Sequence, residues 1–278
     1  MKIVVDSGAT KSDWRILSGS GAPAQQHLFP GMNVSTASME HNLGVLSTAL
    51  EELGRPRLEG LYLYVAGIVT PQVRAVLEER IRSVVEVDEI DIQNDLMGAA
   101  RAVCGRAPGI AAILGTGSNT CFYDGSGVSQ KVRSGGYVIG DEGGGAALGK
   151  LFLSDFIKGL VPAPVAEDFA SRFDSSYEGI VAGVYRSPSP AGYLGSIAPF
   201  VLSHYADPYI RELVDGNFRS FIRRSLLRYD TARYPVGVVG GFGNACRDIF
   251  VRLCTEAGVQ TGSFEAEPVN GLIKYHSI

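Results

Sequence analysis

The chain has 278 residues, of which 45% are apolar and 19% are charged, a balance that suits one large or two ordinary globular domains and argues against disorder. Its 25 basic and 29 acidic side chains leave a formal net charge of −4, which disfavours a nucleic-acid-binding protein because such proteins need a concentrated basic face. No apolar run approaches the roughly 20 residues that cross a bilayer, so we expect no membrane partner.

Strand and helix patterns alternate along the first third of the chain. Short apolar runs predict strands at residues 3–5, 13–17, 26–29, 61–66 and 90–93. Apolar residues at helical spacing predict helices at residues 38–53, 71–85 and 96–104. The first two strands enclose a polar turn rich in small residues, which is typical of a β-hairpin.

The opening pattern then recurs about one domain length later. Strands are predicted at residues 110–114, 120–123, 128–132 and 236–239, and helices across most of 146–230 and at 245–257 and 268–275. A recurring strand–turn–strand unit indicates a duplication. We therefore expect an α/β fold with two lobes, each built on a mixed sheet, and a central cleft.

The cysteines and histidines form no metal or disulfide motif. The four cysteines contain no Cys-x-x-Cys pair, and the four histidines are scattered. The N-terminus reads as a strand rather than as the apolar core of a signal peptide. We therefore expect a protein of the reducing cytoplasm.

Two glycine-rich segments match nucleotide-binding loops only in part. Residues 144–150 read G-x-x-x-x-G-K, but Leu151 stands where a P-loop needs Ser or Thr to reach magnesium. Residues 241–246 nearly match a dinucleotide fingerprint, but too little chain follows to supply its acidic residue. A strand, glycines and a helix in succession still suit a nucleotide, because helix N-termini and bare backbone accept phosphate.

Two other turns carry more specific chemistry. Residues 6–11 and 115–119 are both turns between predicted strands, with backbone N–H groups, hydroxyls and little side-chain bulk. Such turns can bind phosphate oxygens, although the same residue types also favour ordinary hairpins. Asp6 stands at a strand end beside the first turn, where its carboxylate suits a magnesium ion held partly through water.

Several further polar residues have two readings each. Asp95 could cap the helix at 96–104 or accept a proton from a substrate hydroxyl. Asp141 lies between glycines and could stabilise a helix N-terminus or bind ligand hydroxyls. Asn33 could serve a turn or contact a sugar.

Five segments, in order along the chain, carry a resemblance to a known family. They are residues 6–11 (DSGATK), 93–95 (QND), 114–119 (LGTGSN), 136 with 140–143 (GDEG), and 239–241 (VGG). They resemble the phosphate-1, catalytic, phosphate-2, sugar and adenosine motifs of the BadF/BadG/BcrA/BcrD-type ATPase family that includes N-acetylglucosamine kinase. The resemblance spans essentially the whole chain and implies duplicated ribonuclease H-like domains of the actin-like ATPase type.

That resemblance implies a function and a set of site residues. The activity would be ATP- and Mg²⁺-dependent phosphorylation of an amino sugar, at O6, with Asp95 as the catalytic base and Asp6 at the metal. Nucleotide contacts would come from Gly8, Thr10, Lys11, Gly115, Thr116, Gly117, Gly240, Gly241 and Asn244. Sugar contacts would come from Asn33, Asp95, Ser118, Asn119, Gly136 and Asp141.

The resemblance also predicts the domain organisation and leaves rivals open. The expected lobes are residues 1–107, joined by a C-terminal helix at 262–278, and residues 108–261. Gly135 replaces a family tryptophan, which leaves room for a bulkier sugar such as N-acetylmuramic acid. The rival functions are an ATPase that activates a dehydratase through an iron–sulfur cluster and a sugar sensor without catalysis. Sugar kinases of this kind are often homodimers.

Overall fold

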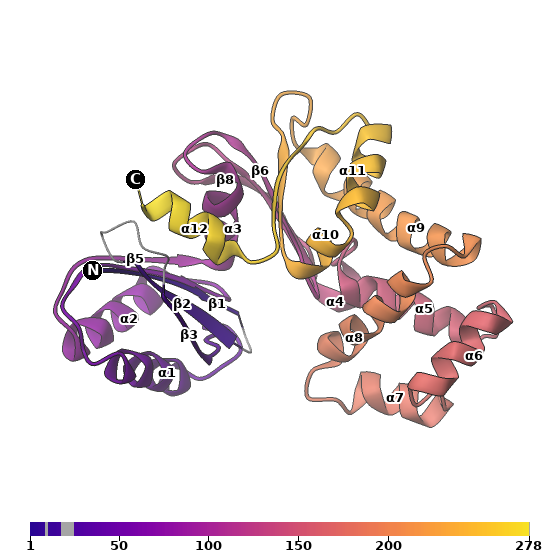
Figure 1. Cartoon of the computed structure of the whole chain (residues 1–278), viewed down its shortest axis with the longest axis horizontal. Helices are drawn as coiled ribbons and strands as arrows, with labels where there is room; N and C mark the ends of the chain where they lie inside the picture. The colour runs from indigo at the N-terminus through magenta and orange to yellow at the C-terminus, as the bar shows by residue number, and fades with distance from the viewer. Residues whose placement is uncertain (9–10, 18–24, 278) are drawn as a thin grey trace. The chain divides into compact units, whose positions relative to one another are not determined.

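The computed structural model describes residues 1–8, 11–17 and 25–277, and it divides into two compact units (Figure 1). Unit 1 comprises Met1–Ala107 and Glu267–Ile278, and unit 2 comprises Pro108–Ala266. The second boundary therefore lies after Ala266, not after residue 261. The reason is a strand at Thr261–Glu265, absent from the sequence prediction, that pairs within the sheet of unit 2.

Unit 1 is built on a five-stranded mixed sheet with the order β3-β2-β1-β4-β5. Its strands are β1 (Lys2–Ser7), β2 (Lys11–Leu17), β3 (Gln25–Pro30), β4 (Leu58–Val65) and β5 (Val87–Asn94). β1, β2 and β3 pair antiparallel, whereas β4 and β5 run parallel to β1. Three parallel strands therefore end at the same edge of the sheet.

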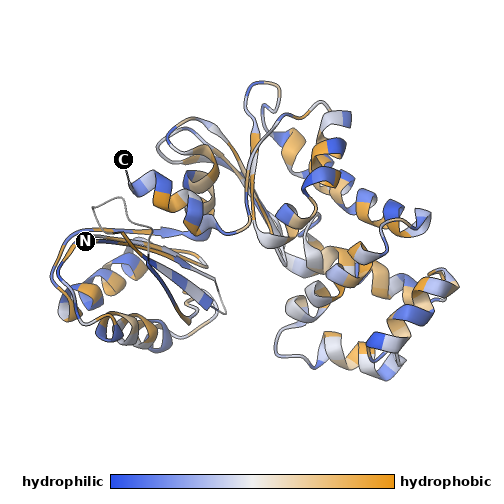
Figure 2. Ribbon diagram, in the orientation of Figure 1, coloured by the Kyte–Doolittle hydropathy of each residue, from blue (hydrophilic) through white to orange (hydrophobic). Residues whose placement is uncertain are grey.

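Alternation along β1 shows how both faces of this sheet are buried. Ile3 and Val5 pack in the cluster that contains buried side chains of α1 (Met39–Glu52) and α2 (Pro71–Val84). Val4 packs on the opposite face with Leu272 of α12 (Pro268–His276). Since side chains alternate across a strand, one apolar run supplies both layers. In Figure 2 the ribbons of these helices alternate between orange, for hydrophobic residues, and blue, for hydrophilic ones.

The C-terminal helix α12 packs closely against α3 (Asp95–Cys104) in unit 1. A Cβ on Gly271 would lie 2.3 Å from the carbonyl oxygen of Ala102, so only glycine permits this approach. His276 is buried at the end of α12, where its ring stacks on Tyr62 and its Nε2 lies 2.8 Å from the Tyr64 hydroxyl. These contacts fix α3, and Asp95 at its start, against the sheet.

Unit 2 repeats the topology of unit 1. Its strands are β6 (Gly109–Leu114), β7 (Ser118–Tyr123), β8 (Val128–Val132), β9 (Val236–Val239) and β10 (Thr261–Glu265), in the order β10-β9-β6-β7-β8. β6, β7 and β8 pair antiparallel, and β9 and β10 run parallel to β6. The strand directions match those of β1 to β5 one for one, which confirms the predicted α/β duplication.

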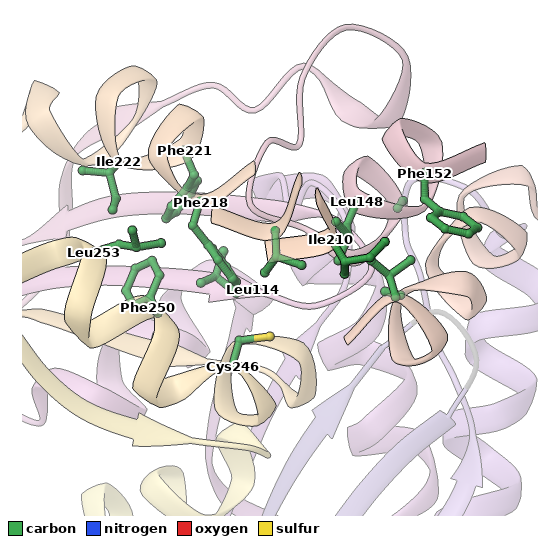
Figure 3. Packing of buried hydrophobic residues seen from close by; sticks show 14 of the residues in the cluster. Leu114, Leu148, Phe152, Ile210, Phe218, Phe221, Ile222, Cys246, Phe250 and Leu253 are labelled. Atoms are coloured by element: carbon green, nitrogen blue, oxygen red, sulfur yellow. The ribbon is translucent and has the colours of Figure 1, made fainter. Parts of the chain in front are cut away.

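The helices of unit 2 surround one large apolar core (Figure 3). They are α4 (Gly136–Ile139), α5 (Gly145–Phe156), α6 (Ala163–Arg172), α7 (Tyr177–Tyr185), α8 (Pro190–Ser203), α9 (Pro208–Arg224), α10 (Gly241–Ala245) and α11 (Arg247–Glu256). Leu114, the last residue of β6, is buried in the same cluster as Phe218 and Phe250. The core thus anchors the strand end from which the second glycine turn leaves. None of the described helices is long and apolar enough to cross a membrane.

The environment of His276 predicts a pH dependence of stability. Burial, with the nearby Arg101 cation, lowers the pKa of His276 to about 4, so the folded protein holds this ring neutral. An unfolded chain protonates it near its ordinary pKa, and stability is therefore lost as pH falls from about 6.5 toward 4.

We expect wild type to be more stable than His276→Gln at pH 7.5, with the advantage shrinking by about 2 kcal/mol at pH 4.5. Chemical denaturation of both proteins at the two pH values measures this difference. An advantage that does not change with pH would contradict the assigned neutral state of the ring.

Candidate functional site

The carboxyl ends of the parallel strands gather the candidate residues of unit 1. The pairs Ser7↔Val65 and Val65↔Asn94 place the ends of β1, β4 and β5 in line. Asp6 and Asp95 therefore lie at one sheet edge. Asn33 joins the same edge through a parallel bridge to Ala66, directly after β4.

Asn33 is held mainly by its backbone. Its N–H donates to Oδ1 of Asn42 at 3.0 Å, and its carbonyl oxygen accepts from Nδ2 of Asn42 at 3.3 Å. Its side-chain Oδ1 accepts the N–H groups of Ser35 and Thr36, which fills both lone pairs. Its Nδ2 makes no hydrogen bond with the described part of the chain, so this amide is the group that Asn33 can offer to a ligand.

Asp95 is not the cap of α3 that the sequence suggested. Asn94 is the N-cap residue, and its side chain accepts the N–H of Met97 at 2.9 Å. Asp95 occupies the first helical position, where its Oδ1 accepts the N–H of Leu96 at 2.8 Å. Its carboxylate is near enough to Asp6 to raise the pKa of that residue.

Asp6 and Asp13 stand directly opposite each other in the antiparallel pair of β1 and β2. Two like charges in this position repel, and Asp13 is stabilised by neighbours. Arg15 donates to both of its carboxylate oxygens, at 2.6 and 2.9 Å, and Gln26 donates at 2.8 Å. These three hydrogen bonds stabilise the Asp13 carboxylate beside Asp6.

The pKa of Asp6 is raised by its surroundings. Burial, followed by the charges of Asp95, Asp13 and Glu267, raises the pKa of Asp6 to about 7, against a partial opposing effect of Lys11. A carboxyl group with a pKa near neutrality binds a proton or a cation readily. This is the behaviour expected of a carboxylate that a divalent cation neutralises when bound.

The first glycine turn is described only in part. The N–H of Gly8 donates to the carbonyl of Lys11 at 3.0 Å, which closes the turn. The Lys11 ammonium is 71% exposed and lies 3.7 Å from Glu267, so it is accessible to an anion. Thr10, predicted to contact phosphate, lies outside the described residues.

The second turn, Gly115 to Gly117, is docked on the N-terminus of α5. The N–H groups of Gly145 and Ala146 donate to the carbonyls of Gly115 and Thr116, at 2.9 and 2.8 Å. The N–H groups of Thr116 and Gly117 donate to none of the described residues. With its carbonyls turned toward α5, the turn presents two backbone donors to an anion.

Asp141 connects the neighbouring loop to this turn. It has a left-handed φ of 58°, and its carboxylate accepts the N–H of Ser118 and the hydroxyl of Ser134. A Cβ on Gly117 would lie 2.5 Å from its Oδ2, so a larger residue there would displace the Asp141 carboxylate. Burial raises the pKa of Asp141. Asp141 and the buried Ser118 thus form one hydrogen-bonded unit beside the second turn.

The remaining predicted residues of unit 2 fall at two places. Gly240 ends β9 with a φ of 120°, and a Cβ there would lie 2.4 Å from the carbonyl oxygen of Leu114. Gly241 and Asn244 follow in α10 and are exposed. Gly136 starts α4, and Asn119 uses its Oδ1 locally on the N–H of Thr120.

Two buried amides were missed from the sequence. Asn42 holds Asn33, as described above, and Asn217 of α9 holds the loop before α5. The N–H of Gly143 donates to Oδ1 of Asn217 at 2.9 Å, and Nδ2 of Asn217 donates to the carbonyl of Gly144 at 3.3 Å. Neither asparagine belongs to a recognised motif. Each forms hydrogen bonds with the backbone of another segment, and the local sequence does not reveal that partner.

The described side chains form no enclosed metal site: no three of the acidic, His or Cys residues among them gather in a suitable arrangement. A Mg²⁺ ion commonly keeps several waters and binds a protein through one or two carboxylates. The half-buried carboxylate of Asp6, with its raised pKa, could be such a ligand. Of the predicted residues, it is the one whose electrostatics fit a Mg²⁺ contact best.

The raised pKa of Asp6 predicts a second stability effect, opposite in sign to that of His276. Between pH 4 and 7 the folded protein keeps a proton on Asp6 that the unfolded chain releases, so stability falls as pH rises through this window. In metal-free buffer, we expect Asp6→Asn to exceed wild type in stability by about 2 kcal/mol more at pH 8 than at pH 4.5. Equal differences at both pH values, measured by denaturation, would rule this out.

The contact of Gly144 with the second turn predicts an effect on nucleotide binding. A Cβ there would lie 2.8 Å from the carbonyl carbon of Gly117, so Gly144→Ala must displace the turn. We expect binding of a nonhydrolysable ATP analogue to weaken at least about tenfold, as measured by calorimetry. Gly216→Ala on α9, where a Cβ meets open space, is the matched control and should bind normally. Unaltered binding by Gly144→Ala would show that the turn does not contact the nucleotide.

Comparisons with known proteins agree with this arrangement. The structure superimposes on a solved protein from Porphyromonas gingivalis, described as a candidate N-acetylglucosamine kinase, with a TM-score of 0.91 and 33% identity over 100% of this chain and 99% of that one. A candidate N-acetylglucosamine kinase from Chromobacterium violaceum gives a TM-score of 0.76 at 20% identity, covering 99% and 98% of the two chains. The latter likeness shows the fold alone.

A relative of named activity is also similar in sequence. The N-acetylmuramic acid/N-acetylglucosamine kinase of Clostridium acetobutylicum is 26% identical over 220 residues, which cover 73% of this chain and 70% of the relative. No family model matches the chain. The full-length match at 33% identity, together with the duplicated topology, shows the family: the chain belongs to the N-acetylglucosamine kinase-like family of BadF/BadG/BcrA/BcrD-type ATPases.

Proposed function

We propose that this protein transfers the γ-phosphoryl group of ATP to a hydroxyl of an amino sugar, at O6. The observation that carries the proposal is the backbone of the second turn, where the N–H groups of Thr116 and Gly117 are directed away from α5 and unused by the described residues. Phosphoryl transfer asks the protein mainly for positioning and charge stabilisation, and fixed backbone donors supply both.

The nucleotide is assigned to glycine-rich backbone in both units. Gly115, Thr116 and Gly117 contact its phosphates in unit 2, and Gly8 and Lys11 do so in unit 1, with the exposed ammonium of Lys11 as a point charge. Gly240, Gly241 and Asn244 are assigned to the adenosine. The close contact of Gly240 with the end of β6 supports this assignment, because it joins the adenosine segment to the phosphate turn.

Asp95 is assigned as the general base. It stands at the beginning of α3, and its carboxylate belongs to the acidic group at the carboxyl end of the parallel strands. From there it would orient the sugar hydroxyl and accept its proton as the oxygen attacks phosphorus. The Nδ2 of Asn33, the Asp141–Ser118 pair, Asn119 and Gly136 are assigned to the remaining sugar hydroxyls and substituents.

Mg²⁺ is assigned to Asp6. When bound, the ion would offset the charge of the β- and γ-phosphates and of the acidic group around Asp6. The high pKa of Asp6 supports this, because a proton then occupies the carboxyl when no cation is present.

The proposed substrates are N-acetylglucosamine and sugars derived from it. Gly135 has a φ of 84°, a conformation that disfavours any larger residue, so the family tryptophan has no equivalent on this backbone. The space left beside Gly136 supports a larger amino sugar such as N-acetylmuramic acid, on which the Clostridium relative is named to act.

The cysteines weigh against the iron–sulfur activator. Burial raises the pKa of Cys104, Cys246 and Cys254 to about 12 in each case, and Cys121 is buried as well. A cluster ligand must be a thiolate, and the burial that raises the pKa of Cys104, Cys246 and Cys254 opposes thiolate formation. Purified protein that is colourless and free of iron would agree with the kinase.

Replacing Asp95 tests the catalytic assignment. Asp95→Asn keeps the size and polarity of the side chain but cannot accept the proton, so we expect kcat to fall by about 10²- to 10⁴-fold while the Kd of the ATP analogue stays unchanged. A coupled assay of ADP release with N-acetylglucosamine, alongside calorimetry, measures both quantities. Retention of wild-type kcat would remove Asp95 from the reaction.

A further inference from the structure

Two buried asparagines use the same device in the two units. Asn217 in α9 is 2% exposed, and its amide bonds one backbone donor and one backbone acceptor of the loop that precedes α5. Asn42 in α1 is fully buried, and its amide bonds both backbone groups of Asn33. Each amide thus replaces the pairing that a neighbouring strand would give.

The loop that Asn217 holds bears directly on the phosphate turn. Gly144, whose carbonyl accepts from Asn217, packs against the backbone of Thr116 and Gly117. The next two residues donate to the carbonyls of this turn, as described above. The amide of Asn217 therefore acts on the turn through the loop that it holds, one hydrogen-bonded step away.

The loop that Asn42 holds contains Asn33, the residue assigned to the sugar. Besides its two bonds to Asn33, Nδ2 of Asn42 donates to the carbonyl of Ser38, the N-cap residue of α1, at 3.1 Å. Asn33 is thereby fixed to the first turn of α1 on one side and to Ala66, after β4, on the other. Its Nδ2 can move only if one of these attachments breaks.

We propose that Asn217 and Asn42 are positioning residues that act separately, Asn217 on the phosphate-binding turn and Asn42 on the sugar-binding Asn33. The inference rests on the proposed function for the identity of the two ligands. A buried amide that is replaced by an apolar side chain leaves two backbone groups without partners, and the loop must move to solvate them. Each variant should therefore weaken the binding of one substrate and leave the binding of the other unchanged.

Alanine variants separate the two roles. We expect Asn217→Ala to raise the KM for Mg-ATP about tenfold and to leave the KM for the sugar nearly unchanged, and Asn42→Ala to give the reverse. In both, kcat should change less than the affected KM. Calorimetry adds a finer readout, because Asn217→Ala should weaken binding of the ATP analogue far more than binding of adenosine.

Matched controls exclude general destabilisation. Asp215→Asn alters a buried side chain two residues away on α9 that bonds Tyr205 and Arg252 and not the loop. Val45→Ala removes buried apolar volume from α1. Both should lower stability without a selective change in either KM. If the controls reproduce the selective pattern, or if each asparagine variant affects both substrates equally or neither, the proposal is wrong.

Two further measurements keep the outcome decisive. Where an alanine variant does not fold, Asn→Ser at the same position, which retains one hydroxyl, should show the same selectivity in weaker form. If wild type shows no sugar-dependent turnover, the proposed function is wrong. The positioning role of Asn217 can then still be tested by measuring backbone hydrogen exchange. Asn217→Ala should speed exchange at the Gly145 and Ala146 N–H groups, whereas Asp215→Asn should not, and equal rates would overturn the proposal.

Discussion

The two hydrogen bonds from the first turn of α5 to the carbonyls of Gly115 and Thr116 determine what the second unit can bind. A helix N-terminus normally leaves its own N–H groups for an anion. Here the N–H groups of Gly145 and Ala146 donate to the turn. The groups left to bind an anion are therefore the N–H groups of the turn itself, those of Thr116 and Gly117. Gly144 and Gly117 allow the backbones to approach closely enough for this exchange, and Asn217 holds the loop that brings them together.

The first unit depends on a balance of charge rather than on backbone donors. Four acidic residues influence one another at the carboxyl end of its parallel strands, and the cations available there are used unequally. Arg15 donates two hydrogen bonds to Asp13, whereas the charge of the Lys11 ammonium opposes the rise in the pKa of Asp6 only in part. The uncompensated negative charge therefore raises the pKa of Asp6. Under the proposed function, a nucleotide carrying Mg²⁺ would offset the negative charge around Asp6.

Much of the fold could be predicted from the sequence, because the strand–turn–strand pattern occurs twice with clear apolar runs. The strand β10 was not predicted because Thr261–Glu265 is mostly polar and contains no buried residue, and its pairing with β9 is set by tertiary structure. The helix expected at 245–257 is α11, which begins at Arg247, and a separate short helix, α10, which the apolar periodicity does not reveal, precedes it at Gly241–Ala245.

The candidate site was predictable to the extent that it lies in turns with distinctive residues. Asp6, Lys11 and Gly115 to Gly117 could be named as candidates because they lie in or beside turns of small residues at strand ends, the kind of backbone that can bind phosphate. Asn42 and Asn217 could not, because a buried asparagine in an amphipathic helix has no local signature; its partner is decided by the fold. The N-cap of α3 was likewise misassigned by one residue, since Asn94 and Asp95 are both good caps.

The most direct test of the account is ADP release from Mg-ATP across a panel of amino sugars, neutral hexoses and no sugar, with mass analysis of the product. The account predicts strong stimulation by an N-acetylated amino sugar and a product heavier by one phosphoryl group. Turnover that does not depend on sugar, or sugar binding without any turnover, would contradict it and would favour an ATPase activator or a sensor instead.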